Sequence, residues 1–556
     1  MRTVKFFAFT LFFLIAISLS GAVTTWTGGT ANWDIATNWD TGTIPSASDD
    51  VIISSGHVTI PASYSAIALS VSISNSSILE LANTGDLQID NATVHGIAIG
   101  TGASLLNSGI ITINSPDIFG IQNSTGTFHN QSTGEIYIIT AGTAGIKNYG
   151  LGAIMTNDGL IDIDETILGD GIYSEKVIVN NLGASINIKN TATNGLDSYG
   201  GFLTNYGSIT IDITGDHGML ISGSSFDNRG YVEVSHCFDG GGSNGAMGIS
   251  ASGIKNSSSG SIYIHHTEAS AIRTEGDLEN SGLIEIYDNS NTGIFVVDGT
   301  LSNQETGDIR LKNNGSDAIS LSLATLENDG IILFDNNAGK AVNLGSGSNS
   351  YNNTNGTLKG NGLISGGSFY DSGSTSPGDN IGSFEIFGYR PDLPTYNMEI
   401  VGPDGAGIAG GYDLLTLTIS PGYSLQGTVN VTFLGDYIGV SQDTFNLFSI
   451  PSGYTGSFDV VNLPALPTGL IWETIYAADG VKFVIDGRIT WTGAVSQDWN
   501  NPSNWDKNTV PNENNDVTIP TGTTYSAHVN SNSTIRSLLV KPGATIVIDQ
   551  NLTVSF

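Results

Sequence analysis

The first candidates for chemistry are three charged side chains: Glu285 in one repeat, and Arg310 and Lys312 in the next. Asp288 and Asp335 lie close to the same phase of the repeat. A carboxylate beside a cation can exchange a proton with a substrate, while the cation steadies developing negative charge. The same residues can also form an ion pair across neighbouring strands, which needs no ligand. We therefore name Glu285, Arg310 and Lys312 as catalytic candidates, with a surface ion pair as the alternative.

A second group is the acidic run that contains Asp162 and Asp164, with Glu165 and Asp170 nearby. Alternation along a strand places Asp162 and Asp164 on one outer face. Carboxylate oxygens are the ligands that calcium prefers, so these two residues are the calcium candidates. No EF-hand loop or Gly-Gly-x-Gly-x-Asp series accompanies them. We expect no other metal or cofactor.

Two neighbouring pairs that contain histidine are also candidates, His265-His266 followed by Glu268, and His236-Cys237. Adjacent residues of a strand point to opposite faces, so we expect neither pair to act together on one ion or substrate. The chain has a single cysteine, which excludes an internal disulfide. It contains no Gly-x-Ser-x-Gly, P-loop or zinc motif.

The composition excludes one class of partner. The chain has 52 acidic and 18 basic residues and a formal charge of −34. Nucleic-acid binding needs a basic surface that neutralises phosphates, so we expect no nucleic-acid partner. Hydrophobic residues make up 39% of the chain, too many for a disordered acidic polypeptide.

An internal repeat positions the candidate residues. The motif Gly-x-Ile-x-Ile recurs every 22–30 residues, from Gly109 to Gly330, and a Gly/Ala-apolar motif runs in phase with it. Within the motif, two branched apolar columns flank a mostly polar one, as expected for strands with one buried face. Such a unit, with about three short strands, predicts an all-β fold: a parallel β-helix of about 11 coils with right-handed crossovers, followed by a β-strand C-terminal region.

Asparagine precedes the motif in most units, as at Asn107, Asn205 and Asn280. Asparagine tolerates a left-handed backbone and glycine accepts a positive φ, so we expect a turn at this point of each coil. Stacked asparagines can also hydrogen-bond along the stack. We favour this structural ladder over a role in ligand contact.

The N-terminus has the pattern of a cleaved secretory signal. Arg2 and Lys5 precede an apolar run over residues 6–19, which small residues follow up to Ala22. This run is shorter than the roughly 20 residues that span a membrane. We predict a signal peptide over 1–22, no membrane span after its removal, and a secreted, extracellular or cell-surface location.

Two distant segments share tryptophan spacings, and six of the seven tryptophans lie in them. Residues 26–53 and 491–519 both begin Trp-Thr-Gly and continue with two further tryptophans, a proline and an aspartate, and the spacings are identical from the second tryptophan onward. We predict that each begins or caps a solenoid, with the indoles covering its open end; the alternative is a platform on which sugars stack.

Residues 357–488 lose the repeat and alternate apolar and polar residues between glycine and proline turns. With Ser376-Pro-Gly-Asp379, Asp413-Leu414 and Leu466-Pro-Thr-Gly-Leu-Ile-Trp472, this region resembles the passenger domains of autotransporter-type surface proteins near the end of their β-helix. The tryptophan segments look like those of large secreted proteins of the same kind. No translocator barrel follows in this sequence, so we do not expect self-translocation.

The sequence predicts five regions. They are the signal peptide 1–22, a tryptophan-rich N-terminal module and cap 23–95, β-helix repeats 96–356, the passenger-like region 357–488, and a second tryptophan module 489–556 that is either incomplete or closes on itself.

The resemblance implies an adhesin-like or structural surface protein that binds an extracellular glycan or a surface protein, with specificity from outer columns and from a loop at 238–248. The first alternative is a polysaccharide lyase or glycoside hydrolase on a β-helix similar to pectate lyases. The second is a glycan-binding module without catalysis.

Overall fold

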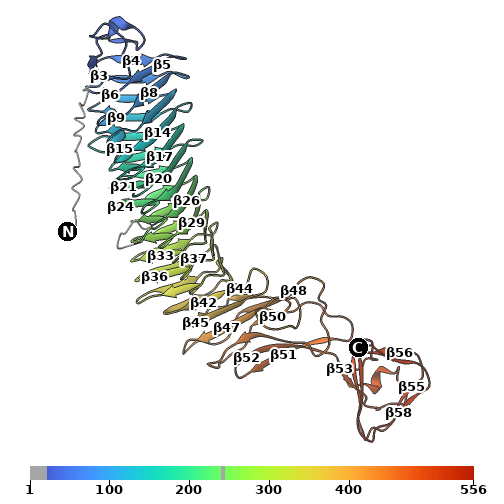
Figure 1. Ribbon diagram of the computed structural model, residues 1–556. Helices are drawn as coiled ribbons and strands as arrows, with labels where there is room; N and C mark the ends of the chain where they lie inside the picture. The colour runs from blue at the N-terminus through green and yellow to red at the C-terminus, as the bar shows by residue number, and fades with distance from the viewer. Residues whose placement is uncertain (1–21, 239–244, 556) are drawn as a thin grey trace, which may run out of the picture. The chain divides into compact units, whose positions relative to one another are not determined.

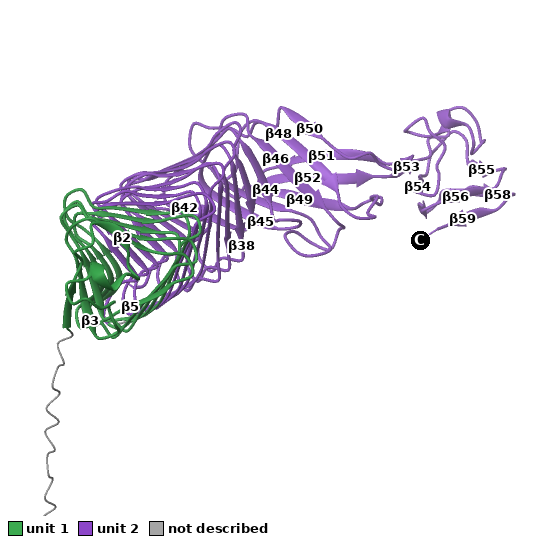
Figure 2. Cartoon of the chain, turned by 90° about the horizontal axis from the view of Figure 1, so that it is seen from above, with its two compact units in different colours: residues 1–167 green, residues 168–556 purple. Residues whose placement is uncertain are grey.

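A computed structural model describes residues 22–238 and 245–555. The predicted signal peptide lies outside the described residues except for Ala22, and so do residues 239–244 of the predicted loop. The chain forms two compact units, which meet in the sequence at Ile167 and Leu168 (Figure 2). In the part that the structure describes, no helix is long and apolar enough to cross a membrane.

Each unit is a parallel β-solenoid in which most turns contribute three short strands (Figure 1). A strand typically pairs in parallel with the strand three elements later in the chain. In unit 1 this order joins β3 (Asp49–Ile53), β6 (Ser70–Ile73) and β9 (His95–Ile99). In unit 2 it joins β26 (Tyr231–Cys237), β29 (Ser261–Thr267) and β32 (Leu283–Tyr287). The predicted fold class is confirmed.

The number of coils was underestimated. The described residues form about 21 turns, so the expectation of about 11 is wrong. Turns also lie outside the repeat, for example through β3 and β6 before it and through β45 (Ser383–Pro391) and β47 (Leu414–Ile419) after it. These strands keep the alternating burial but lack the Gly-x-Ile-x-Ile motif, and counting the motif therefore missed them.

The repeat columns lie where the alternation placed them. In unit 2, Val232, Ile262 and Ile284 are paired neighbours with 0% exposure, and Glu233, Tyr263 and Glu285 form the outer column beside them. Branched side chains pack closely in such columns, and burying one fully stabilises the fold by about 1.5–3 kcal/mol. The core is therefore a stack of apolar side chains inside the coils.

A second interior column consists of hydrogen-bonded asparagines. In unit 2, the Nδ2 of each asparagine donates to the Oδ1 of the next at 2.8–2.9 Å. The members are Asn180, Asn205, Asn228, Asn256, Asn280, Asn303, Asn328 and Asn352. They are at most 2% exposed, so they do not contact ligands, and the predicted structural ladder is confirmed.

The unit 2 ladder continues into a buried carboxylate. Asn352 donates to Asp371, and the hydroxyl of Tyr389 donates to the same carboxylate at 2.8 Å. Asp371 and Tyr389 are both 0% exposed. Burial raises the pKa of Asp371 to about 6, although its hydrogen bonds act in the opposite direction.

The glycine that recurs in each repeat has a different structural cause from the one expected. Gly230 does not adopt a positive φ. Instead, a Cβ at Gly230 would lie 2.1 Å from the carbonyl oxygen of Gly207 in the preceding coil. At most repeat positions glycine is therefore required because the backbones of successive coils approach closely there; Gly183, which has a φ of 84° and open space beside it, is an exception.

The left-handed residues occupy another column, at or just after the ends of the strands that contain the repeat motif. In unit 2 they include His236, His266, Asp288 and Asn313, with φ between 51° and 57°. A non-glycine residue in this region is uncommon, and it turns its side chain away from strict alternation. Two of these residues, His236 and His266, therefore present their rings on faces that alternation does not predict.

The tryptophans form the interior of their segments. Trp26, Trp33 and Trp39 are at most 2% exposed, and so are their counterparts Trp491, Trp499 and Trp505. A sugar can stack only on an accessible ring, so the alternative of a sugar-stacking platform is wrong. The indoles pack edge to face and build a small local core.

Candidate functional site

The structure brings the three predicted catalytic candidates together on one outer surface of unit 2. Glu285 in β32 is the register partner of Arg310 in β35 (Asp308–Lys312), and the Nζ of Lys312 lies 4.0 Å from the Oε1 of Glu285. All three side chains are partly exposed. The predicted proximity of Glu285 and Arg310 is confirmed by the register.

The closest acidic partner of Arg310 is Asp308 on its own strand. The Nη2 and Nε of Arg310 donate to Asp308 Oδ2 at 2.6 and 3.0 Å. This hydrogen bond raises the pKa of Arg310 further, with Glu285 contributing less. Residues two apart on a strand share a face, so the guanidinium is occupied as a surface ion pair before any ligand arrives.

The calcium candidates Asp162 and Asp164 lie on the outer side of β17 (Leu160–Thr166) in unit 1, where both side chains are partly exposed. Their shared face agrees with the alternation used to choose them. Among the described residues, no group of three or more His, Cys, Asp or Glu side chains is arranged to hold a metal ion. A calcium role for Asp162 and Asp164 stays a prediction.

The expectation that His265 and His266 point to opposite faces is wrong. The Nδ1 atoms of the two rings lie 2.7 Å apart. The cause is the left-handed backbone of His266, with a φ of 57°, which breaks the alternation at the end of β29. His236 has the same conformation one coil earlier, and its ring stacks on His266 with centroids 4.9 Å apart.

His236 and Cys237 do not form a pair, as expected. Cys237 is fully buried, and burial raises the pKa of its thiol to about 12. His236 instead lies 2.7 Å from a carboxylate oxygen of Asp212. A buried, protonated thiol is a poor nucleophile, so Cys237 belongs to the core.

Six rings gather on the outer side of three consecutive coils, and we call this surface the aromatic face. Tyr231 and Tyr263 have ring centroids 5.3 Å apart, and His265 stacks on Tyr287 at 4.8 Å. The stacked pair of His236 and His266 lies beside them. The aromatic face comprises Tyr231, His236, Tyr263, His265, His266 and Tyr287.

Carboxylates border these rings and fix some of their polar atoms. The Tyr231 hydroxyl donates to Glu233 Oε2 at 2.7 Å, and the Nε2 of His265 lies 3.4 Å from Glu233 Oε1. Partial burial raises the pKa of Tyr231, and the neighbouring Glu233 adds to the rise. Partial burial alone would raise the pKa of Asp212, but hydrogen bonds from Ser235 and His236 outweigh it and lower this pKa. The face therefore offers flat rings beside carboxyl groups that accept hydrogen bonds.

The sequence columns contained a signal for this face. Tyr263 and Glu285 belong to the middle column of the repeat, whereas Tyr231 lies two residues before that column and His265 and Tyr287 two residues after it. Extending the alignment by two residues on each side would have shown rings in successive coils. The two left-handed histidines could not have been placed this way, because their backbone departs from the alternation.

A shallow groove of about 320 Å³ crosses a different outer surface of unit 2. Asp216, Arg273 and Glu275 are among its lining residues, and Arg273 pairs with Glu275 at 2.8 Å. Asp197 is the register partner of Leu220 in the groove wall. Burial, together with the charge of Asp170, raises the pKa of Asp197 to about 7. A carboxyl group of this kind beside a groove is suited to proton transfer.

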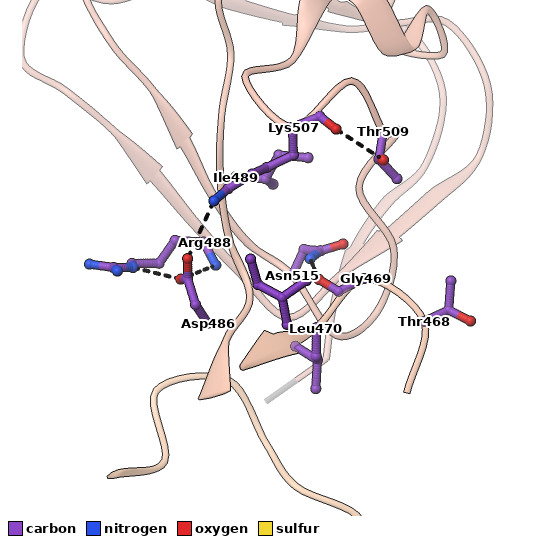
Figure 3. A pocket seen from close by; sticks show the side chains of 10 residues that line it. Thr468, Gly469, Leu470, Asp486, Arg488, Ile489, Lys507, Thr509 and Asn515 are labelled. Carbon is purple, nitrogen blue, oxygen red and sulfur yellow. Dashed lines mark hydrogen bonds and ion pairs between the residues drawn. The ribbon is translucent and has the colours of Figure 1, made fainter. Parts of the chain in front are cut away.

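A cavity of about 340 Å³ lies between the end of the passenger-like region and the C-terminal tryptophan segment (Figure 3). Leu470 and Ile489 supply buried apolar wall, and Asp486, Arg488 and Lys507 supply charge. Asp486 accepts from the Nε of Arg488 at 2.7 Å and lies 3.5 Å from the Nζ of Lys507.

Comparison with known proteins identifies one region of the chain. Residues 490–556 match the family model of a domain of unknown function, DUF8693. This match coincides with the C-terminal tryptophan segment and the strands after it. A search of curated proteins found no match to the chain.

Proposed function

We propose that this protein is a secreted or cell-surface β-helix protein with an adhesin-like, binding role, and that it binds an extracellular glycan through the aromatic face. The observation that supports the proposal is the set of closely packed rings on consecutive coils, with Glu233 and Glu285 beside them. Aromatic faces pack against apolar C–H surfaces of sugars, and carboxylates accept hydrogen bonds from hydroxyl groups.

The charge of the chain narrows the glycan class. With a formal charge of −34, the protein repels polyanions unless a cation bridges them. The aromatic face itself has more acidic than basic neighbours. Neutral polysaccharides are therefore the preferred ligands, and acidic ones would need a bridging cation such as calcium. A surface protein with a basic patch is the alternative partner.

A screen of the secreted protein against a polysaccharide panel, with and without calcium, tests this proposal. Replacing both Tyr263 and Tyr287 by alanine should weaken glycan binding at least tenfold, equivalent to about 1.4 kcal/mol. Tyr525→Ala, which removes an exposed ring elsewhere in the chain, is the matched control and should leave binding unchanged. Unchanged binding in the double variant would exclude the aromatic face as the site.

Export is a separate part of the proposal. The basic start and apolar run of residues 1–22 support cleavage near Ala22. Mass spectrometry of the protein recovered from the medium or the cell surface should find an N-terminus near residue 23. An intact Met1 on the exported protein would contradict this.

The groove beside Asp197 supports a second candidate function, cleavage of a polysaccharide. A carboxyl group that is half protonated near neutral pH can act as a general acid. Measuring reducing or unsaturated ends in the same wells tests it: Asp197→Asn should abolish product formation if the groove is catalytic. Product formation that depends on Arg310 and not on Asp197 would place the reaction at the Glu285–Arg310–Lys312 surface instead.

A further inference from the structure

We infer that the cavity beside the C-terminal tryptophan segment binds a small hydroxylated carboxylate the size of one sugar ring, such as a sugar acid. Its lining residues belong to unit 2 and come from residues 468–489 and 507–515. This inference goes beyond the glycan-binding role proposed for the aromatic face, which uses other residues.

The walls of the cavity are held by contacts between distant parts of the sequence. Asn512 and Asn514 both donate to the carbonyl oxygen of Thr468, at 2.9 and 3.0 Å. Asn515 donates to the carbonyl oxygen of Gly469 at 2.7 Å. Gly469 has a φ of 92°, and a Cβ there would lie 2.8 Å from side-chain atoms of Asn512 and Asn515. These hydrogen bonds fix the shape of the cavity, and the lack of a side chain at Gly469 leaves room for the side chains of Asn512 and Asn515.

The charges in the cavity favour a single carboxylate. Two of the ten lining residues are basic and one is acidic, in a chain where acidic residues greatly outnumber basic ones. Arg488 is engaged by Asp486 at 2.7 Å and by Glu473 at 3.5 Å, and Figure 3 shows its guanidinium extending away from Leu470 and Asn515. Lys507 lies farther from Asp486, at 3.5 Å, so its ammonium protons can serve a ligand.

Asp486 limits how much negative charge the cavity accepts. Burial alone would raise the pKa of Asp486, but the hydrogen bonds from Arg488 and the charge of Lys507 outweigh it and lower this pKa. Asp486 therefore stays ionised at neutral pH and repels a doubly charged anion. One carboxylate on Lys507 is compatible with it, whereas a phosphate is not favoured.

The size and the remaining lining favour a ring with hydroxyl groups. A volume of about 340 Å³ lies at the lower end of the roughly 300–1,000 Å³ of ligand pockets, which suits one ring. Leu470 and Ile489 offer apolar wall for the body of a ring. Thr468 and Thr509 add hydroxyl groups to the lining, and the Thr509 hydroxyl, which donates to the carbonyl oxygen of Lys507 at 3.3 Å, can accept a hydrogen bond from a substituent. A bare inorganic ion would leave the apolar wall without contacts.

Isothermal titration of the full secreted protein with glucuronate and with glucose tests the inference, because the two sugars differ in the carboxylate. We expect glucuronate to bind with a Kd on the order of 1 mM and glucose to bind at least tenfold more weakly. Lys507→Gln should weaken glucuronate binding at least tenfold. Lys541→Gln, which replaces an exposed lysine outside the cavity but within the same matched region 490–556, should leave it unchanged.

Other outcomes would overturn the inference. These are equal binding of glucose, tighter binding of inorganic phosphate, no binding of any probe, or unchanged binding in Lys507→Gln. Thr509→Phe, which fills the cavity without removing a charge, guards against misfolding of the lysine variant and should also abolish binding. Loss of polysaccharide binding in the tyrosine double variant, with glucuronate binding retained, separates this site from the aromatic face.

Discussion

The three tryptophans of the N-terminal segment pack almost as the three of the C-terminal segment do. The first and third rings lie 4.9 Å apart in both, and the second and third lie 4.8 Å apart. The third indole donates to the carbonyl oxygen of the second tryptophan at 2.9 Å in both segments. This packing is local, so the same spacing of residues builds the same small core in two different units.

The two segments differ in what their shared aspartate contacts. Asp50 is partly exposed and accepts from Ser70 at 2.6 Å. Its counterpart Asp516 is 7% exposed and accepts from four side chains. The donors to Asp516 are Ser441, Gln442, Arg536 and Ser537. Two of these donors precede the segment in the chain, so Asp516 also ties the segment to the strands before it.

The coil after each segment differs as well. Val71 and Ile73 of β6 are at most 1% exposed, whereas Val540 of β57 (Ser537–Val540) is 37% exposed. Both strands pair in parallel with the strand that ends the tryptophan segment, β3 or β54 (Asp516–Ile519). The packing of the three tryptophan rings thus depends on local spacing. The contacts of the aspartate and the burial of the next strand depend instead on the chain segments that surround them.

The largest expected effect tests the shared core. Trp33→Ala and Trp499→Ala should each lower the local stability by about 3–5 kcal/mol, because both indoles are fully buried. Hydrogen exchange measured by mass spectrometry at β3 and at β54 reports each segment separately. Similar losses would support one common core. A large loss of stability in one segment alone would show that the two tryptophan cores are not equivalent.

The next effect tests the difference at the aspartate. Asp516→Ala should raise exchange at β54 by an amount equivalent to about 2–4 kcal/mol, since it leaves several buried donors without an acceptor. Asp50→Ala should cost about 1 kcal/mol at β3, because one hydrogen bond is lost. Equal costs would show that the contacts from Ser441 and Gln442 add no stability.

The pH dependence should separate Asp516 from the buried carboxylate of the coil stack. Hydrogen bonds outweigh burial and lower the pKa of Asp516, so its stabilisation is present above pH ~4 and is lost as the pH falls further. Burial raises the pKa of Asp371 to about 6, so its contribution is present below pH ~4 and is lost as the pH rises through 6. The rise in the pKa of Asp371 from 3.8 to about 6 corresponds to about 3 kcal/mol.

Hydrogen-exchange profiles measured between pH 3 and 8 test these two opposite pH dependences of stability. Asp371→Asn should remove the loss of local stability above pH 5 at β45. It should leave unchanged the loss of local stability at low pH at β54. Asp516→Asn should do the reverse. A profile at β45 that rises in stability with pH would contradict the expected sign for Asp371.

The smallest effect tests a contact that both segments share. Thr25 donates its backbone N–H to Asp40 at 2.8 Å, and Thr490 donates to Asp506 at 2.9 Å. Both carboxylates are exposed, so Asp40→Ala and Asp506→Ala should each cost about 0.5–1.5 kcal/mol. Clearly unequal costs would show that the environment, rather than the local geometry, sets the strength of this contact.

The fold could be predicted largely from periodic residues. The columns through Ile262 and Ile264 are buried as the alternation requires, and the asparagines form the expected ladder. Coils without the motif were missed, because their strands share burial but no diagnostic residues. The repeated glycine was placed correctly, but its cause is the approach of neighbouring backbones rather than a turn.

The candidate sites were less predictable. The register of Glu285 and Arg310 followed from the period, but the preference of Arg310 for Asp308 depends on side-chain geometry within one strand. The meeting of His265 and His266 depends on one left-handed residue, which alternation cannot show. The cavity at Lys507 joins residues about 20 to 40 positions apart, so no local pattern indicated it.

The sequence by itself determined the stack of coils, because a 22–30-residue period of apolar, asparagine and glycine residues is satisfied when identical positions lie above one another. It also determined the edge-to-face packing of the tryptophans, whose ring–ring contacts span few residues. Tertiary structure alone decided which charged groups pair, where the aromatic face forms and how the cavity closes. These features arise from side-chain orientation and from contacts between distant segments, and neither is encoded in a local period.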